Sequence, residues 1–297
     1  MNTLSGLGTA LITPFLQNQD IDFTALEGLV ELQIQAGVDY LVVLGTTAES
    51  ATLTENEKQQ VRQIIVGKNA GRVPLVLGIG GNNTAKVVSE LTNLRNPDDF
   101  AAILSVCPYY NKPSQEGLFQ HFCAIADASP LPVILYNVPG RTGVNLLPQT
   151  VMRIKKTCPK KIIGIKEASG NIEQITELIS LRDKEKTTQK DFDLLVISGD
   201  DGITAELMDK GANGLISVAA NAFPLSFSEI VKNKQGKRHE TQDKFAQIVS
   251  LLFKEGNPAG IKTVLTEKGY IHNVLRLPLV RNSSATQIEI RHALAEL

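Results

Sequence analysis

The chain of 297 residues has few of the features that mark secreted, metal-binding or membrane proteins. Its three cysteines, Cys107, Cys123 and Cys158, are an odd number without a CxxC spacing, which argues against a disulfide framework and a zinc site. No apolar run reaches the roughly 18 residues of a membrane span, and the N-terminus does not resemble a signal peptide. Thirty Lys and Arg against 31 Asp and Glu leave a net charge of −1, without the basic surplus of nucleic-acid-binding proteins. We therefore expect a cytoplasmic protein with no nucleic-acid and no membrane partner.

The sequence does contain a regular alternation of short apolar runs and longer amphipathic segments. The apolar runs are Leu7–Thr13, Tyr40–Leu44, Pro74–Ile79, Ala101–Cys107, Pro132–Tyr136, Lys161–Ile165, Asp193–Ile197 and Gly214–Val218. Because none alternates polar with apolar residues, each predicts a strand buried on both faces. Helical patterns between them include Phe23–Gln35, Glu55–Lys68, Thr84–Leu94, Gln115–Ala126 and Ile172–Leu181. Eight strand–helix units in about 220 residues fit a closed (β/α)8 TIM barrel better than an open doubly wound sheet.

Beyond about residue 222 the sequence has no further strand pattern. Helices are expected at Phe223–Lys232, Gln242–Lys254, Pro258–Lys268 and Thr286–Leu294. We therefore predict two domains, a catalytic barrel over residues 1–222 and a small helical domain over 223–297. Three local signals accompany this prediction: a capping box at Thr54-Glu55-Asn56-Glu57, a helix-ending glycine at Gly37, and an exposed loop over the polar run Asp183–Lys190.

Active sites of barrels form at the carboxyl ends of the strands, so the residues there carry the functional prediction. Lys166 directly follows the sixth apolar run, at the end of a buried strand, where burial disfavours the charged ammonium and a neutral amine can form a Schiff base with a carbonyl. The alternative is a lysine that extends out of the barrel into water. Tyr136 ends the fifth run, with its hydroxyl in reach of the barrel mouth. Tyr110 lies in a stiff loop after the fourth run, and either passes protons or packs as an apolar side chain.

Three further strand ends carry polar groups. The turn with Thr46 and Thr47 offers hydroxyls and backbone N–H groups that either hold a carboxylate or phosphate, or cap a helix. Arg141 suits a carboxylate, or is a solvated surface charge. Asp200 and Asp201 suggest either a metal site or helix capping; we favour capping and predict no metal, because no histidine is suitably spaced. Together these groups indicate a Schiff-base enzyme that uses no metal and no cofactor.

Five segments taken together resemble the dihydrodipicolinate synthase family of the pyruvate-dependent class I aldolases. They are Gly45-Thr46-Thr47 with Glu49-Ser50, Pro108-Tyr109-Tyr110-Asn111-Lys112-Pro113-Ser114-Gln115-Glu116-Gly117, Tyr136-Asn137-Val138-Pro139-Gly140-Arg141-Thr142-Gly143, Ile163-Gly164-Ile165-Lys166-Glu167 and Ser198-Gly199-Asp200-Asp201. The resemblance covers essentially the whole chain. N-acetylneuraminate lyase shares the lysine, the tyrosine and a Gly-x-Thr turn, but the Val-Pro-Gly-Arg-Thr-Gly stretch and the Thr-Thr pair are more similar to the synthases.

The resemblance implies that the protein condenses pyruvate with L-aspartate 4-semialdehyde to give 4-hydroxy-2,3,4,5-tetrahydrodipicolinate, the first committed step of the diaminopimelate and lysine pathway. It implies that Lys166 forms an imine with the ketone of pyruvate, and that Thr46 and Thr47 hold the pyruvate carboxylate. Arg141 is implied to bind the carboxylate of the semialdehyde.

The same resemblance implies a proton relay of Tyr136, Thr46 and Tyr110, with Tyr110 reaching in from a neighbouring subunit. Gly199 and Ile216 are implied to line the pocket through backbone contacts. Similar enzymes are homotetramers built from two tight dimers, so a homotetramer is expected here.

The sequence departs from the family at two places that matter. Ala48 stands where the family usually has glycine, and would be strained if that position has a positive φ. The positions that match the family's lysine-inhibition cleft are Ser50, Ala51, Glu55, Lys58, Asn82, Lys86 and Tyr109. Lys86 replaces a glutamate of the sensitive members and should repel the ammonium groups of lysine, while Glu55 offsets this in part. We expect inhibition by lysine to be weak or absent.

Two other functions remain open on the sequence alone. One is a related pyruvate-dependent aldolase or lyase, such as N-acetylneuraminate lyase, which differs in its second substrate. The other is a non-catalytic barrel that serves as a ligand sensor or structural subunit, which the fold alone permits.

Overall fold

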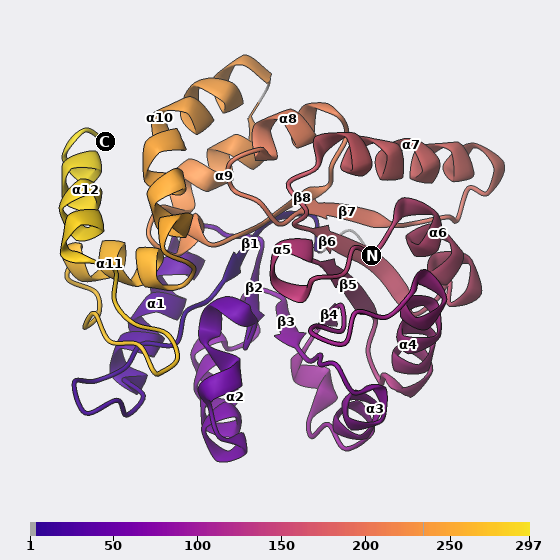
Figure 1. The fold of residues 1–297 in the computed structure, drawn as a ribbon, viewed down its shortest axis with the longest axis horizontal. Helices are drawn as coiled ribbons and strands as arrows, with labels where there is room; N and C mark the ends of the chain where they lie inside the picture. The colour runs from indigo at the N-terminus through magenta and orange to yellow at the C-terminus, as the bar shows by residue number, and fades with distance from the viewer. Residues whose placement is uncertain (1–3, 234) are drawn as a thin grey trace. The chain divides into compact units, whose positions relative to one another are not determined.

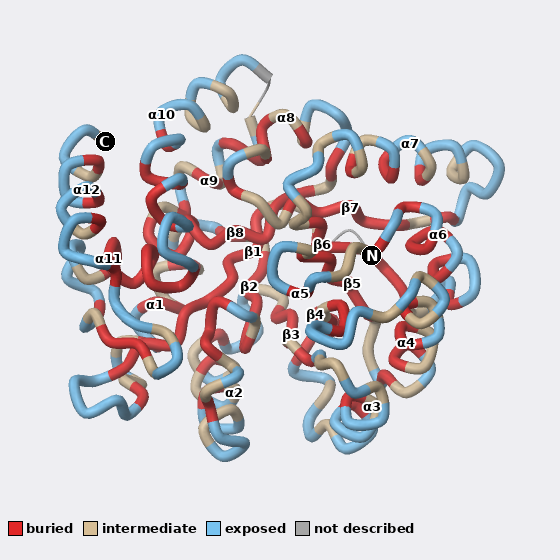
Figure 2. The backbone as a smooth tube through the Cα atoms, in the orientation of Figure 1, coloured by how far each residue is buried: buried red, intermediate tan, exposed pale blue. Residues whose placement is uncertain are grey.

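The computed structural model describes residues 4–233 and 235–297, and within them it has eight parallel strands. The strands are β1 (Gly6–Ala10), β2 (Tyr40–Val43), β3 (Leu75–Gly78), β4 (Ala102–Val106), β5 (Val133–Asn137), β6 (Ile162–Glu167), β7 (Leu195–Ser198) and β8 (Gly214–Ser217). They follow one another in sequence order around a closed barrel (Figure 1), which confirms the predicted TIM barrel and excludes the open sheet. Every residue of β2, β5, β6, β7 and β8 is buried, as the unbroken apolar runs predict (Figure 2).

Helices connect the strands, and the five predicted between them are all present. The helices are α1 (Phe23–Gln35), α2 (Glu55–Asn69), α3 (Thr84–Thr92), α4 (Gln115–Ala128), α5 (Pro139–Thr142), α6 (Pro148–Thr157), α7 (Ile172–Thr188) and α8 (Thr204–Asp209). Short 3-10 turns are η2 (Thr46–Ala48), η3 (Ser50–Thr52), η4 (Pro97–Asp99) and η5 (Ala219–Asn221). The sequence did not predict α5, α6 and α8. Helices α5 and α8 have only 4 and 6 residues and display few repeats of an apolar period, whereas α6, with 10 residues, is longer than the predicted α3.

Both helix-end signals are confirmed. The N–H of Thr54 donates to Glu57 Oε2 at 2.8 Å, and Thr54 Oγ1 accepts from the N–H of Glu57 at 3.2 Å, which completes the capping box of α2. Gly37 follows the end of α1 with φ of +73°, the left-handed conformation that glycine adopts without strain.

The predicted loop Asp183–Lys190 is wrong over most of its length, because α7 continues to Thr188. Lysine and glutamate favour helices, and Glu185 forms an ion pair with Lys156 of α6 at 2.5 Å. The buried Arg182 also donates from Nε to Asp183 at 2.8 Å, at the start of the segment. The polar run is therefore explained by the solvent exposure of the last turns of α7, and not by a loop.

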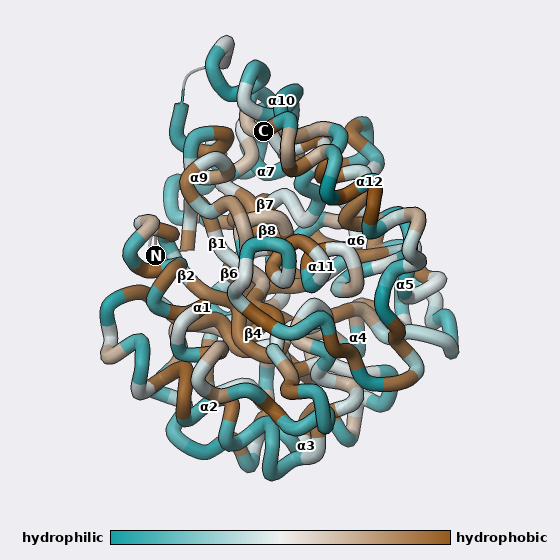
Figure 3. The backbone as a smooth tube through the Cα atoms, turned by 90° about the vertical axis from the view of Figure 1, so that its left-hand side faces the viewer, coloured by the Kyte–Doolittle hydropathy of each residue, from teal (hydrophilic) through white to brown (hydrophobic). Residues whose placement is uncertain are grey.

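Four helices follow the barrel strands, as predicted. They are α9 (Pro224–Lys232), α10 (Gln235–Lys254), α11 (Ala259–Glu267) and α12 (Ser284–Ala295). Helix α10 begins at Gln235, earlier than the predicted Gln242. The prediction missed its first turns because they are hydrophilic and show no apolar period (Figure 3). No helix of the described residues has the length and apolar composition to cross a membrane.

Backbone contacts divide the chain into two compact units. Unit 1 contains the residues up to Pro74 together with Ser217–Leu297, and unit 2 contains Leu75–Ile216. Unit 1 thus combines the first barrel strands with the C-terminal helices. The predicted division into residues 1–222 and 223–297 stays a prediction about domains.

Candidate active site

Strand β6 of unit 2 carries Lys166, whose amine is buried against an aromatic ring. Lys166 and Tyr136 are paired in register on β6 and β5, and are 6% and 7% exposed. Lys166 Nζ lies 4.4 Å from the centroid of the Tyr136 ring. The lysine therefore does not extend into water. A primary amine and a phenol beside one another supply the nucleophile and the proton donor that imine chemistry needs.

Gly199, directly after β7, leaves the room that Lys166 occupies. Its N–H donates to the Glu167 carbonyl at 2.7 Å. A Cβ at this position would lie 3.0 Å from Lys166 Cε and 2.7 Å from the Cβ of Ala168, closer than side chains normally pack. A larger residue would displace the lysine stem. Ile216 is buried in β8 of the same unit.

Behind this pair, a second register pair forms a polar network that sequence reasoning missed. Because side chains alternate along a strand, Asn137 and Glu167 face away from Tyr136 and Lys166. Asn137 Nδ2 donates to both Glu167 oxygens at 3.1 and 3.0 Å, and the N–H of Ser169 donates to Oε1 at 2.8 Å. Burial raises the pKa of the Glu167 carboxyl, and these hydrogen bonds oppose the rise. The sequence signal that could have revealed this network is the position of two polar residues, Asn137 and Glu167, just beyond the fifth and sixth apolar runs.

The loops that carry Arg141 and Tyr110 are joined to each other. Arg141 lies exposed in α5, directly after β5. The N–H of Tyr110 donates to the Thr142 carbonyl at 3.2 Å, which ties the Tyr110 loop to α5. The Tyr110 side chain is 88% exposed, so within one chain it does not pack as a core aromatic.

In unit 1, the turn after β2 holds Thr46 and Thr47. Thr46 is exposed and Thr47 is buried. The first hydrogen bond of the turn runs from the N–H of Ala48 to the Gly45 carbonyl at 3.1 Å, so the N–H groups of both threonines precede it. Thr47 Oγ1 accepts a hydrogen bond from Asn257 Nδ2 at 3.0 Å, while its own hydroxyl hydrogen stays available for donation.

Ala48 fits this turn without the strain that its departure from glycine suggested. Ala48 lies inside η2, and the residues around this turn that have positive φ are Leu44 at +56° and Glu49 at +54°. The left-handed conformation therefore falls on the next residue, and an alanine is tolerated.

The residues expected to bind lysine as an inhibitor are divided between the two units. In unit 1, Lys58 Nζ donates to Glu55 Oε1 at 2.8 Å, so the glutamate that was expected to attract lysine already has a cation beside it. In unit 2, Asn82 Nδ2 donates to the Tyr109 carbonyl at 3.1 Å, and Lys86 lies in the first turn of α3.

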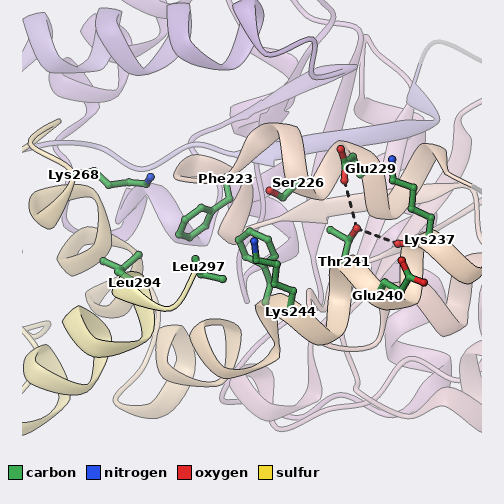
Figure 4. A pocket seen from close by; sticks show the side chains of 11 residues that line it. Phe223, Ser226, Glu229, Lys237, Glu240, Thr241, Lys244, Lys268, Leu294 and Leu297 are labelled. Carbon is green, nitrogen blue, oxygen red and sulfur yellow. Dashed lines mark hydrogen bonds between the residues drawn. The ribbon is translucent and has the colours of Figure 1, made fainter.

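A pocket of about 530 Å³ lies among the C-terminal helices of unit 1, lined by residues that include Phe223, Glu229, Lys237, Lys244 and Lys268 (Figure 4). None of the predicted site residues lines it. Over residues 4–233 and 235–297, no three His, Cys, Asp or Glu side chains are grouped so that they could hold a metal ion.

The structure therefore brings together Lys166, Tyr136 and Gly199, and it joins the loops of Tyr110 and Arg141. Thr46 and Thr47 lie in unit 1, with a different set of supporting residues. Each predicted site residue lies in a barrel strand or in the segment that follows one, as expected for barrel chemistry.

Comparisons with known proteins identify relatives of this chain. The 4-hydroxy-tetrahydrodipicolinate synthase of Parabacteroides distasonis is 50% identical to this chain, over 99% of the chain and 97% of the relative. The structure of dihydrodipicolinate synthase from Thermotoga maritima matches with a TM-score of 0.91 and 39% identity, over 99% of this chain and 98% of that one. The chloride-inhibited synthase from Acinetobacter baumannii, solved with pyruvate, matches with a TM-score of 0.90 and 37% identity, over 99% and 98% of the two chains.

A model of the dihydrodipicolinate synthetase family matches residues 3–297. A family match over nearly the whole chain, together with a relative that is half identical over the same length, shows that this chain belongs to the dihydrodipicolinate synthetase family.

Proposed function

We propose that this protein is a lyase that condenses pyruvate with L-aspartate 4-semialdehyde, through a Schiff base on Lys166, to give 4-hydroxy-2,3,4,5-tetrahydrodipicolinate. The observation that carries the proposal is the buried amine of Lys166, 4.4 Å from the Tyr136 ring at the carboxyl end of a barrel strand. The relative named 4-hydroxy-tetrahydrodipicolinate synthase at 50% identity supports this reaction over that of N-acetylneuraminate lyase.

The chemistry proceeds through one covalent attachment. The Lys166 amine attacks the ketone carbon of pyruvate, and loss of one water gives the imine. Removal of a methyl proton gives an enamine, whose carbon attacks the aldehyde carbon of the semialdehyde. The amino group of the semialdehyde then attacks the imine carbon, closes the ring and displaces Lys166. Each turnover joins the two substrates, releases one water and restores the lysine.

Substrate carboxylates need their own partners in this scheme. Thr46 and Thr47 hold the pyruvate carboxylate through hydroxyl and backbone N–H groups, consistent with N–H groups that precede the first hydrogen bond of the turn. Arg141 binds the carboxylate of the semialdehyde through its planar guanidinium, which matches a carboxylate with two parallel hydrogen bonds. Backbone groups of Gly199 and Ile216 line the pocket.

Protons move through a relay of Tyr136, Thr46 and Tyr110. The exposure of Tyr110 supports a contribution from a neighbouring subunit, because a phenol that is 88% exposed in one chain is available to a second copy. We accordingly propose a homotetramer built from two tight dimers. The three thiols Cys107, Cys123 and Cys158 are free, which supports a cytoplasmic location.

An assay with two substrate sets tests the function. The purified protein should consume pyruvate only when aspartate semialdehyde is present, without an added metal or cofactor. It should release no pyruvate from N-acetylneuraminate. Release of pyruvate from the sialic acid, with no condensation, would replace the proposal with the lyase; absence of both activities would favour a non-catalytic barrel.

A further inference from the structure

The turn that carries Thr46 and Thr47 ends on a buried ion pair with the C-terminal helices. Glu49, in the left-handed conformation at φ of +54°, closes the turn and is 3% exposed. Its Oε1 pairs with Nζ of Lys262 on α11, and both side chains are fully buried. Lys262 also donates to the Val274 carbonyl at 3.0 Å, and its Nζ lies 4.1 Å from the centroid of the Phe15 ring.

A backbone N–H binds the other oxygen of the same carboxylate. The N–H of Arg276 donates to Glu49 Oε2 at 3.1 Å, and its guanidinium donates to both oxygens of Glu57 at 3.0 and 2.5 Å. The same guanidinium donates to the Thr52 carbonyl at 3.1 Å. The segment directly after the turn is therefore fastened to residues more than 200 positions away in the chain.

Asn257 reaches the turn itself. It is buried, lies before α11, and donates from Nδ2 to Thr47 Oγ1. Since Thr47 Oγ1 accepts this bond, its hydroxyl hydrogen is directed toward another acceptor. Two anchors thus meet at one turn: Asn257 on the hydroxyl of Thr47, and Lys262 on the carboxylate of Glu49.

We propose that Asn257 and the Glu49–Lys262 pair are positioning residues, which hold the Thr46–Thr47 turn in the conformation that binds the carboxylate of pyruvate. The inference rests on the proposed function, because it takes these threonines as the pyruvate site. It assigns a role to the segment after β8: this segment sets the affinity for the first substrate and takes no part in the covalent chemistry.

The physical reason lies in the ion pair. A buried carboxylate without its cation must recruit water or move toward solvent. Either response releases Glu49 from its left-handed conformation, which persists only while its surroundings fix it. The two residues before Ala48 then lose their fixed geometry, and a carboxylate site displaced by about 1 Å binds less well.

The test measures pyruvate separately from the semialdehyde. Lys262→Met removes the charge and keeps the approximate length of the side chain. Asn257→Ala removes the other anchor without leaving a buried charge. Thr263→Val is the matched control on α11, since Thr263 is equally buried and donates to Asn282 at 2.9 Å, away from the turn. For each variant, KM is measured for both substrates, along with the pyruvate concentration that half-saturates borohydride trapping on Lys166.

We expect both anchor variants to raise the KM and the half-saturating concentration for pyruvate by about tenfold or more, with KM for the semialdehyde within about twofold of wild type. Lys262→Arg should recover part of the loss, while Thr263→Val lowers Tm without changing pyruvate affinity. If Lys262→Met does not fold, Asn257→Ala decides alone.

Wild-type pyruvate affinity in Asn257→Ala, or the same loss in Thr263→Val, would overturn the positioning role. Failure of the proposed function has a different result: wild-type protein that forms no pyruvate adduct on Lys166.

Discussion

The residues proposed to act on pyruvate are held by different kinds of polar contact in the two units. In unit 2, the strands that carry Tyr136 and Lys166 are joined by Asn137 and Glu167, which are register neighbours and part of one hydrogen-bond network. In unit 1, the turn with the two threonines is held by the ammonium of Lys262 and the backbone N–H of Arg276, both on a segment distant in sequence. Pairing between adjacent strands holds the proposed nucleophile, whereas contacts with a distant segment, an ion pair among them, hold the turn proposed to bind pyruvate. Variants of Lys166 should therefore affect kcat, and variants around the turn should affect KM for pyruvate.

Replacing Lys166, which lies on β6, removes the proposed nucleophile and should have the largest effect on activity. Lys166→Ala should lower kcat by several orders of magnitude, because the covalent step disappears. Steady-state turnover with both substrates measures it, with circular dichroism as the check on folding. Retention of more than about a tenth of the activity would refute the assignment.

Removing a single hydroxyl from Tyr110 should come next. Tyr110→Phe should lower kcat by roughly a hundredfold, in the range of lost acid–base catalysis, with Tm unchanged because the ring is exposed. The semialdehyde assay and a thermal melt measure the two effects. Dilution of the wild type to monomers should also abolish activity, and a fully active monomer would contradict the shared site.

Inhibition by lysine should depend on charged residues that lie in both units. We expect it to be weak or absent, because Lys86 repels the effector and Glu55 is already paired with Lys58. Loss of about 2.7 kcal/mol would weaken binding roughly a hundredfold. A steady-state assay with added lysine measures it, and half-inhibition below about 1 mM would show that Lys86 does not block the site. Lys86→Glu should raise the sensitivity.

Arg141→Ala should weaken binding of the semialdehyde and spare pyruvate, whereas Lys262→Met should weaken binding of pyruvate and spare the semialdehyde. It should raise KM for the semialdehyde by about tenfold or more, because a charged hydrogen bond to its carboxylate is lost. Borohydride trapping of pyruvate on Lys166 should remain at the wild-type level. Equal weakening of both substrates would make Arg141 a structural residue.

Acid should weaken the Glu57–Arg276 ion pair, with a small effect on stability. The Arg276 guanidinium lowers the pKa of Glu57 to about 2, below the usual 4.5. A lowered carboxyl pKa stabilises the fold above pH 4.5, and the gain is lost as pH falls from 4.5 toward 2. Partial exposure limits it to about 1 kcal/mol. Denaturant melts of wild type and Glu57→Gln should differ by this amount at pH 6 and converge near pH 2. A constant difference would contradict the ion pair's role.

The barrel and the residues at its strand ends were predictable because each depends on a local pattern. Unbroken apolar runs predicted all eight strands, and Lys166 and Tyr136 were singled out by their positions at strand ends. Arg141 lies in α5, and only the family resemblance gave it a role. Residues outside such patterns were not predictable. Lys262 stands among Ile261, Val264 and Leu265 on α11, and its partner Glu49 is 213 positions earlier, a separation at which no local period operates. A lysine within an apolar helix segment was the available signal, since a buried charge needs a partner.

The central claim is that Lys166 forms an imine with pyruvate, and covalent trapping tests it most directly. The wild-type protein is incubated with pyruvate alone, reduced with borohydride, digested, and mapped by mass spectrometry. The account predicts one reduced pyruvyl adduct, on the peptide that contains Lys166, and none in Lys166→Ala. An unmodified Lys166, or an adduct on another lysine in the wild type, would contradict it.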